Sequence, residues 1–192
     1  WEYRYEEAED ILTEAEKLAK ETHNNPGLAE VYSHFGIMYQ HWGKFEKSLI
    51  FLEKSLEIQS DLHDKFEEAK IYQNIGNFYS YNTPKQNMKK AKQYLDKSLD
   101  IYEELEEDHA IANACATFSV LYKNMREYSE SIIHSIDALG KFRALSMRFY
   151  EYRIMCVLSD TYIKLGMYSM ADKYVDDILS ISEEFEDYLI MG

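Results

Sequence analysis

The sequence predicts an all-α protein, built as a right-handed solenoid of antiparallel helix hairpins. Two observations predict this fold class. Chain breakers are rare, with 7 Gly and 2 Pro in 192 residues, which favours long helices over an all-β chain. One segment also recurs: Ala29–Tyr39 returns as Ala69–Tyr79, and in more altered form at 112–122 and 152–162. A segment that recurs at a nearly constant period is typical of solenoid proteins.

The first expected helix covers residues 5–22. Ala8, Ile11 and Leu12 begin an apolar series with the 3.6-residue period of a helix, and the series continues to Ala19. The next four residues after Thr22 and His23 are Asn-Asn-Pro-Gly, a strong turn signal. This helix is therefore expected to end before the turn, and the next one to begin at residue 28.

Four helix hairpins are expected after this first helix. Only a few residues separate consecutive helices, so the two helices of each pair must lie antiparallel. Gly43 follows the first helix of the first pair, as a C-terminal cap would, and the second connection carries three extra residues around Pro84. The expected pairs are 28–42 with 45–62, 67–81 with 87–105, 110–124 with 127–145, and 148–164 with 168–186.

The four hairpins share one register. In the first helices the corresponding tyrosines are separated by 40, 43 and 40 residues, and the 43 reflects the longer loop; they are Tyr39, Tyr79, Tyr122 and Tyr162. The second helices carry small residues at one position, namely Ser48, Ala91, Ser131 and Ala171. Ala8 and Ala15 lie 40 residues before Ser48 and Ser55, so the first helix belongs to the same register. Small residues let helices approach to 8–10 Å, which explains their recurrence.

These residues resemble the tetratricopeptide repeat, whose pattern is an aromatic residue, Leu-Gly and Tyr on the first helix and Ala, aromatic, Ala on the second. The matching residues of the first repeat are Tyr32, Phe35, Gly36, Tyr39, Ser48, Leu52 and Ser55, and those of the second are Tyr72, Ile75, Gly76, Tyr79, Ala91, Leu95 and Ser98. The third and fourth repeats depart from the pattern, because Ser119 and Ser159 replace the glycine. The resemblance covers nearly the whole chain.

The period of 40 residues exceeds the usual 34 of this family. In this respect the chain resembles the long-helix branch of the family. We expect one solenoid domain over residues 1–192 and interpret the chain as a fragment of a longer protein. Its expected parts are 5–23 as the second helix of a truncated repeat, then repeats at 28–66, 67–108, 109–147 and 148–188.

The net charge of −14 argues against nucleic acid or an anionic membrane surface as partner. An acidic protein can bind a basic partner, but solubility alone is the simpler interpretation. Cys115 and Cys156 have no spacing that indicates a disulfide framework or a zinc site. The sequence contains no run of 18 apolar residues that could span a membrane. A cytoplasmic location is expected.

The resemblance implies a concave groove lined by the first helices. The charged residues expected there give a net charge of +2, from Lys70, Lys123, Arg153 and Lys164 against Glu30 and Asp160. The groove is therefore expected to accept an acidic or neutral segment, although six charges could also be distributed by chance. Asn74 resembles the asparagine with which long-helix relatives bind a peptide backbone, and an amide offers both donor and acceptor. The candidate binding residues are Asn74, Asn77, Lys70, Gln73, His34, His41, Lys123, Asn113, Arg153 and Lys164.

No catalytic or nucleotide-binding motif of the common kinds occurs in the sequence, so neither enzymatic activity nor a cofactor is expected. His34 and His41 are seven residues apart, on one helix face; a groove-lining pair is favoured over a metal site.

The expected function is therefore a non-catalytic scaffold that binds a protein or peptide segment in its groove. The alternative is a sensory or regulatory region of a bacterial signalling protein, such as a nucleotide cyclase, histidine kinase or transcription regulator, that dimerises or switches on ligand binding. A third interpretation is a structural subunit that assembles through its exposed ends. Homo-oligomerisation stays open in all three.

Overall fold

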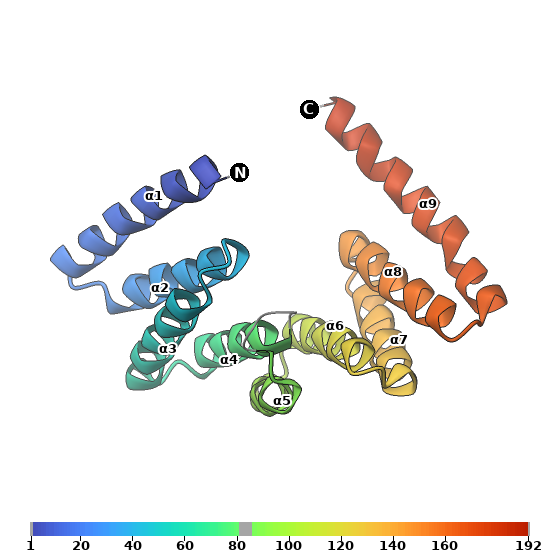
Figure 1. Cartoon of the computed structure of the whole chain (residues 1–192), viewed down its shortest axis with the longest axis horizontal. Coiled ribbons are helices and arrows are strands. Elements are labelled where there is room, and N and C mark those ends of the chain that lie inside the picture. Colours follow the sequence, from blue (N-terminus) through green and yellow to red (C-terminus); the bar gives the residue numbers. More distant parts are fainter. Residues whose placement is uncertain (1, 81–85, 192) are drawn as a thin grey trace. The chain divides into compact units, whose positions relative to one another are not determined.

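The computed structural model describes the backbone of residues 2–80 and 86–191, and the side chains of residues 4–80 and 86–183. These residues form an all-α structure in which the helices pair as the hairpins α2–α3, α4–α5, α6–α7 and α8–α9 (Figure 1). Residues 81–85 of the second predicted connection, with Pro84 and the expected insertion, lie outside the described part. The helices are α1 (Glu2–Glu21), α2 (Asn25–His41), α3 (Phe45–Leu62), α4 (Lys65–Ser80), α5 (Met88–Glu104), α6 (Asp108–Asn124), α7 (Tyr128–Ala144), α8 (Arg148–Lys164) and α9 (Tyr168–Met191).

The second helix begins earlier than the sequence predicted. It starts at Asn25 and not at residue 28, because Asn24 caps it: the Asn24 side chain accepts a hydrogen bond from the backbone N–H of Gly27 at 3.0 Å. Pro26 is compatible with this position, since the first turn of a helix needs no N–H from it. The residues that indicated a turn thus form the cap and first turn of α2.

Residues in the left-handed region mark the helix connections. Within hairpins they are Gly43, Arg126 and Gly166, with φ of 78°, 62° and 71°. Between hairpins they are His23, His63, Glu106 and Ser146, with φ between 52° and 56°. The predicted cap at Gly43 is confirmed, and Lys44 N–H closes it on the Tyr39 carbonyl at 2.8 Å. Apart from Gly43 and Gly166, these turns use side-chain-bearing residues in a conformation that favours glycine.

The small residues of the repeat permit close helix approach, as predicted. A Cβ atom placed on Gly36 of α2 would lie 2.5 Å from Leu52 Cγ in α3. Opposite α2, Ser48 Oγ donates to the Gly36 carbonyl at 2.7 Å, and Ser55 Oγ donates to the Ala29 carbonyl at 2.6 Å. The serines therefore contribute hydrogen bonds as well as small volume to the α2–α3 contact.

The chain divides into two compact units, residues 1–105 with α1–α5 and residues 106–192 with α6–α9. In the first unit an aromatic cluster of Tyr32, Phe35 and Tyr39 packs between α1 and α3. In the second unit the core includes Phe142, Met155 and Leu158, together with other buried side chains. Burial of this apolar surface is the main force that holds the hairpins together.

The core of the second unit has Ser119 where the first unit has Gly36, and Ser135 where it has Leu52. Ser131 Oγ donates to the Ser119 carbonyl at 2.8 Å and lies 3.4 Å from Thr161 Oγ1. Ser135 is fully buried, and its hydroxyl makes no hydrogen bond within the described part of the chain. Each unit thus fills the same helix contact with different side chains.

Candidate functional site

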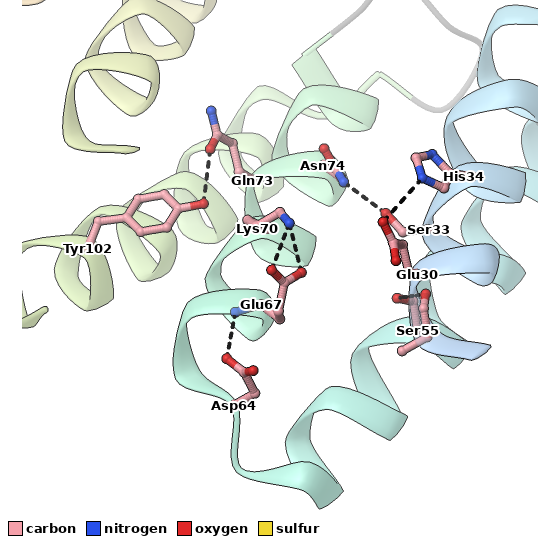
Figure 2. A network of polar contacts seen from close by, with 11 residues as sticks. Glu30, Ser33, His34, Ser55, Asp64, Glu67, Lys70, Gln73, Asn74 and Tyr102 are labelled. Carbon is pink, nitrogen blue, oxygen red and sulfur yellow. Dashed lines mark hydrogen bonds and ion pairs between the residues drawn. The ribbon is translucent and has the colours of Figure 1, made fainter. Parts of the chain in front are cut away.

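The first helices of the first unit are joined by a polar contact at the residue that the sequence singled out. Asn74 of α4 donates from Nδ2 to Ser33 Oγ of α2 at 3.2 Å (Figure 2). Both side chains are at least partly buried, and 41 residues separate them in the sequence. The bond holds the Asn74 amide on the side of α4 that faces α2, and Asn77 lies one turn further on, half-buried.

Other candidate residues of α4 have different partners. Lys70 Nζ lies 2.8 Å from both carboxylate oxygens of Glu67, one turn earlier on the same helix. The Tyr102 hydroxyl of α5 donates to Gln73 Oε1 at 3.3 Å, so Gln73 points toward α5 while Asn74 points toward α2 (Figure 2). Gln73 and Asn74, although adjacent in sequence, therefore do not serve one surface.

The two histidines of α2 are both exposed. His34 Nε2 lies 3.8 Å from Glu30 Oε1 on the same helix. His41 lies at the end of α2, where its backbone carbonyl accepts a hydrogen bond from the Tyr5 hydroxyl at 3.3 Å. Among the described residues, no group of three or more His, Cys, Asp or Glu side chains is arranged to hold a metal ion.

In the second unit an ion pair joins the two first helices. Lys123 Nζ of α6 lies 2.9 Å from Asp160 Oδ2 of α8, and Lys164 Nζ lies 3.6 Å from Asp160 Oδ1. Burial raises the pKa of Asp160, but the hydrogen bond from Lys123 and the nearby charges outweigh it, so the pKa lies below its ordinary value of 3.8. This pair occupies the α6–α8 contact much as Asn74 and Ser33 occupy the α2–α4 contact.

The remaining candidates lie on the same two helices. Asn113 Nδ2 of α6 is 3.2 Å from the His109 carbonyl oxygen and 3.1 Å from His109 Nε2. The Arg153 guanidinium of α8 lies 6.0 Å from the centre of the Phe149 ring, which is 52% exposed. Arg153 is exposed and Asn113 is partly exposed.

The charge of the candidate faces differs between the units. In the first unit Lys70 is accompanied by two carboxylates, Glu30 and Glu67. In the second, the expected residues are Lys123, Arg153, Lys164 and Asp160, and Asp160 lies against both lysines. The positive excess that the sequence predicted therefore resides in the second unit, where Asp160 neutralises part of it.

Two residues that complete these contacts, Glu67 and Tyr102, were not expected on the groove face. Glu67 could have been found, because an acid three residues before a lysine on a helix indicates a surface pair. Tyr102 belongs to a second helix, and no local pattern connects it with Gln73.

Together these features define an α-helical repeat protein whose first helices expose polar side chains above a packed hairpin core. A sequence profile of the tetratricopeptide repeat family matches residues 3–61, and a second profile of that family matches residues 152–185. Residues 3–61 and 152–185 therefore contain tetratricopeptide repeats. Such repeats are protein-interaction scaffolds and typically lack catalytic activity. Curated protein sequences include no significant match.

Solved structures share this fold at low sequence identity. BtubC (BKLC) from P. vanneervenii superposes with a TM-score of 0.79 at 20% identity, over 96% of this chain and 76% of that one. A signal transduction ATPase with a tetratricopeptide repeat sensor from Pyrococcus horikoshii gives 0.78 at 22% identity, over 96% of this chain and 28% of that one. The apo form of RapI gives 0.76 at 18% identity, over 95% of this chain and 50% of that one.

The chain thus spans about half of RapI and little more than a quarter of the ATPase. At these identities the likeness concerns the fold. Within the described residues, no helix is long and apolar enough to cross a membrane.

Proposed function

We propose that the chain is a non-catalytic binding module for protein or peptide segments, and that it binds them on the faces of its first helices. The observation that carries the proposal is the position of Asn74. Its amide is held by Ser33 on the side of α4 that faces α2, next to the half-buried Asn77 and the exposed His34. An amide in a fixed orientation can bond a peptide unit without further ordering, which reduces the entropic cost of binding.

The second unit offers a different chemistry for the same task. Lys123, Lys164 and Arg153 lie on α6 and α8 with Asp160 between the lysines. A carboxylate of a ligand could approach Arg153 and Lys164, the more exposed of the two lysines. An arginine bonds carboxylates through two parallel N–H donors. We therefore propose that an acidic segment binds at α6 and α8, and a neutral, polar segment at α2 and α4.

A quantitative capture experiment tests this proposal. The immobilised chain is exposed to a lysate as wild type, as Asn74→Ala and as Lys123→Glu, and the retained proteins are quantified by mass spectrometry. Each candidate partner is then purified and its affinity measured directly. We expect Asn74→Ala to weaken partners of the first unit, and Lys123→Glu to weaken acidic partners of the second.

Gln93→Ala on α5 and Lys173→Glu on α9 serve as controls, because both residues are exposed on second helices. Circular dichroism must show that all variants retain their helix content. Partners that bind every variant equally, or that are lost only with the controls, would contradict binding on the first helices.

A sensory or regulatory role is the second candidate, and one observation favours it. The Pyrococcus horikoshii protein with the same fold uses its repeats as a sensor, as its name states. Under this alternative, ligand binding would change the oligomeric state, and sedimentation velocity with and without a captured partner would detect the change.

A further inference from the structure

A pocket lies between α7, α8 and α9 of the second unit. Its floor is formed by three buried side chains, Glu151, Met155 and Ile181, and its exposed rim by Arg143, Arg148, Asp177 and Ser180. The pocket has a volume of about 100 Å³ and opens to solvent. A cavity of about this size can admit one aromatic ring.

The repeat register explains why there is space at this point. Met155 stands at the position that Tyr32 and Tyr72 hold in the first two repeats. Tyr32 packs on Phe51 with ring centres 5.5 Å apart, and Tyr72 packs on Tyr94 at 6.1 Å. Met155 is fully buried as well, but it brings neither a ring nor a hydroxyl to the α8–α9 contact.

The residues around the pocket correspond to those that hold the Tyr72 ring. The Tyr72 hydroxyl donates to Glu68 Oε1 at 2.8 Å, and Lys97 Nζ lies 5.1 Å from the centre of the ring. The counterparts of Glu68 and Lys97 in the fourth repeat are Glu151 and Asp177, and both line the pocket. The pocket therefore lies where the second repeat holds a phenol ring.

The buried carboxylate of Glu151 has capacity for a further donor. Its Oε2 lies 3.5 Å from Arg148 NH1 and 3.7 Å from Arg143 Nε. Both distances exceed the usual length of a charge-assisted hydrogen bond, about 2.7–2.9 Å. Because both contacts reach the same oxygen, a hydroxyl in the pocket can donate to Oε1, as the Tyr72 hydroxyl donates to Glu68.

The rim of the pocket can open at low cost. Arg143 NH2 of α7 lies 3.5 Å from Asp177 Oδ2 of α9, and the two side chains are 52% and 57% exposed. An ion pair between exposed side chains contributes little to stability, so an entering group can separate it. A guanidinium also binds the face of an aromatic ring, so Arg143 gains a contact when a ring enters.

The third repeat offers a useful contrast. Cys115 stands at the position of Met155 and is also smaller than tyrosine, but Ile111 replaces the glutamate. The Cys115 thiol lies 3.1 Å from Oδ2 of Asp137, which is an exposed residue. A phenol at this position would therefore lack the buried acceptor that Glu151 provides in the fourth repeat.

We propose that the pocket between α7, α8 and α9 binds the side chain of a tyrosine of a partner protein. The phenol hydroxyl donates to Glu151, the ring packs on Met155 and Ile181, and Arg143 covers its outer face. The pocket lining includes none of the candidate residues of the first-helix faces, so the proposal stands whether or not those faces bind a segment.

Two small compounds provide the probe. N-acetyl-tyrosinamide carries the phenol, and N-acetyl-phenylalaninamide is the matched compound without the hydroxyl. Each is titrated into the whole chain labelled with ¹³C at the methionine methyl groups, and the spectra are recorded by NMR. The Met155 methyl signal, assigned with Met155→Leu, is expected to shift to saturation because the ring current of the bound phenol acts on it.

The phenylalanine compound is expected to bind about tenfold more weakly or less, because the hydrogen bond to a carboxylate is lost. Glu151→Gln should reduce this preference, since the acceptor loses its charge. The methyl signal of Met167, an exposed residue outside the pocket lining, serves as the control and should not move.

Met155→Tyr places the tyrosine of the earlier repeats in the pocket and should abolish binding, as measured by saturation transfer to the tyrosine compound. Circular dichroism must show that this variant retains its helix content. The proposal is overturned if the Met155 signal does not shift, if both compounds bind the wild type equally, or if folded Met155→Tyr binds as the wild type does. The comparison of the two compounds uses the wild type alone, so it decides the matter even if Met155→Tyr does not fold.

Discussion

Replacing Gly36 by alanine should destabilise the protein, although alanine is the better helix former. The added Cβ would lie 2.5 Å from Leu52 Cγ and 2.6 Å from Leu52 Cδ2, and 3.3 Å from the carbonyl oxygen of Ser48. Leu52 is fully buried and cannot move aside without displacing its neighbours. Overpacking of this kind costs about 1–3 kcal/mol. The gain in helix propensity is about 1 kcal/mol, so the net loss should be up to about 2 kcal/mol.

The same substitution at Gly140 of α7 is the matched control. Gly140 is also within a helix, but a Cβ there would meet no atom within 4 Å. Gly140→Ala should therefore stabilise by about 0.5–1 kcal/mol through propensity alone. Urea unfolding followed by circular dichroism gives the sign of the change in the free energy of unfolding for each variant. Hydrogen exchange shows in which unit the stability changes.

A second substitution tests the cause of the loss. If the clash with Leu52 is responsible, Leu52→Val should be less costly in the Gly36→Ala background than in the wild type, with a coupling of about 0.5–3 kcal/mol. The fourth repeat already combines a larger residue, Ser159, with a smaller one, Val175, at these positions. If Gly36→Ala stabilised the protein as Gly140→Ala does, or the two changes were additive, the packing account of the repeat glycine would be refuted.

Three further outcomes are expected, each measured by urea unfolding. Ser135→Ala should leave stability unchanged or raise it by about 1–2 kcal/mol, because the buried hydroxyl makes no hydrogen bond within the described residues; a clear loss would reveal a hidden partner. Tyr39→Phe should cost about 1–2 kcal/mol, since the Tyr39 hydroxyl donates to Glu9 at 2.6 Å. The hydrogen bond lowers the pKa of Glu9 below 4.5, so this contribution is complete above that pH and is lost as the pH falls through the folded pKa; a deficit independent of pH would contradict it. Arg126→Gly should stabilise and Gly43→Ala destabilise, each by about 1 kcal/mol, because both residues have positive φ, 62° and 78°.

The helices, the hairpins and the repeat register were all predictable from the sequence. Small residues stand where two helices approach closely. Because this constraint recurs in every hairpin, small residues recur with the period of the repeat. The start of α2 was predicted three residues too late, because Asn24 and Pro26 were interpreted as a turn. The same residue types favour both a turn and a helix cap, and only the hydrogen bond to Gly27 distinguishes them.

The candidate site was predictable only in part. Asn74 was expected to face a partner, and in the structure its amide also donates to Ser33, 41 residues away. Lys123 and Asp160 were both counted in the net charge of the groove, but not as a pair; in the structure they lie against each other, 37 residues apart in the sequence. Such pairs depend on the distance between two helices and on side-chain rotamers, neither of which affects the period of the sequence.

The sequence by itself determined the fold class, the register of the repeat and the positions at which helices touch. These properties follow from short-range periodicity, because each residue type must satisfy the same local packing in every repeat. Only the tertiary structure decided which polar groups meet across helices and where the positive charge is neutralised. Those facts arise from contacts between distant segments. Because each such contact occurs only once, the repeat pattern of the sequence does not predict it.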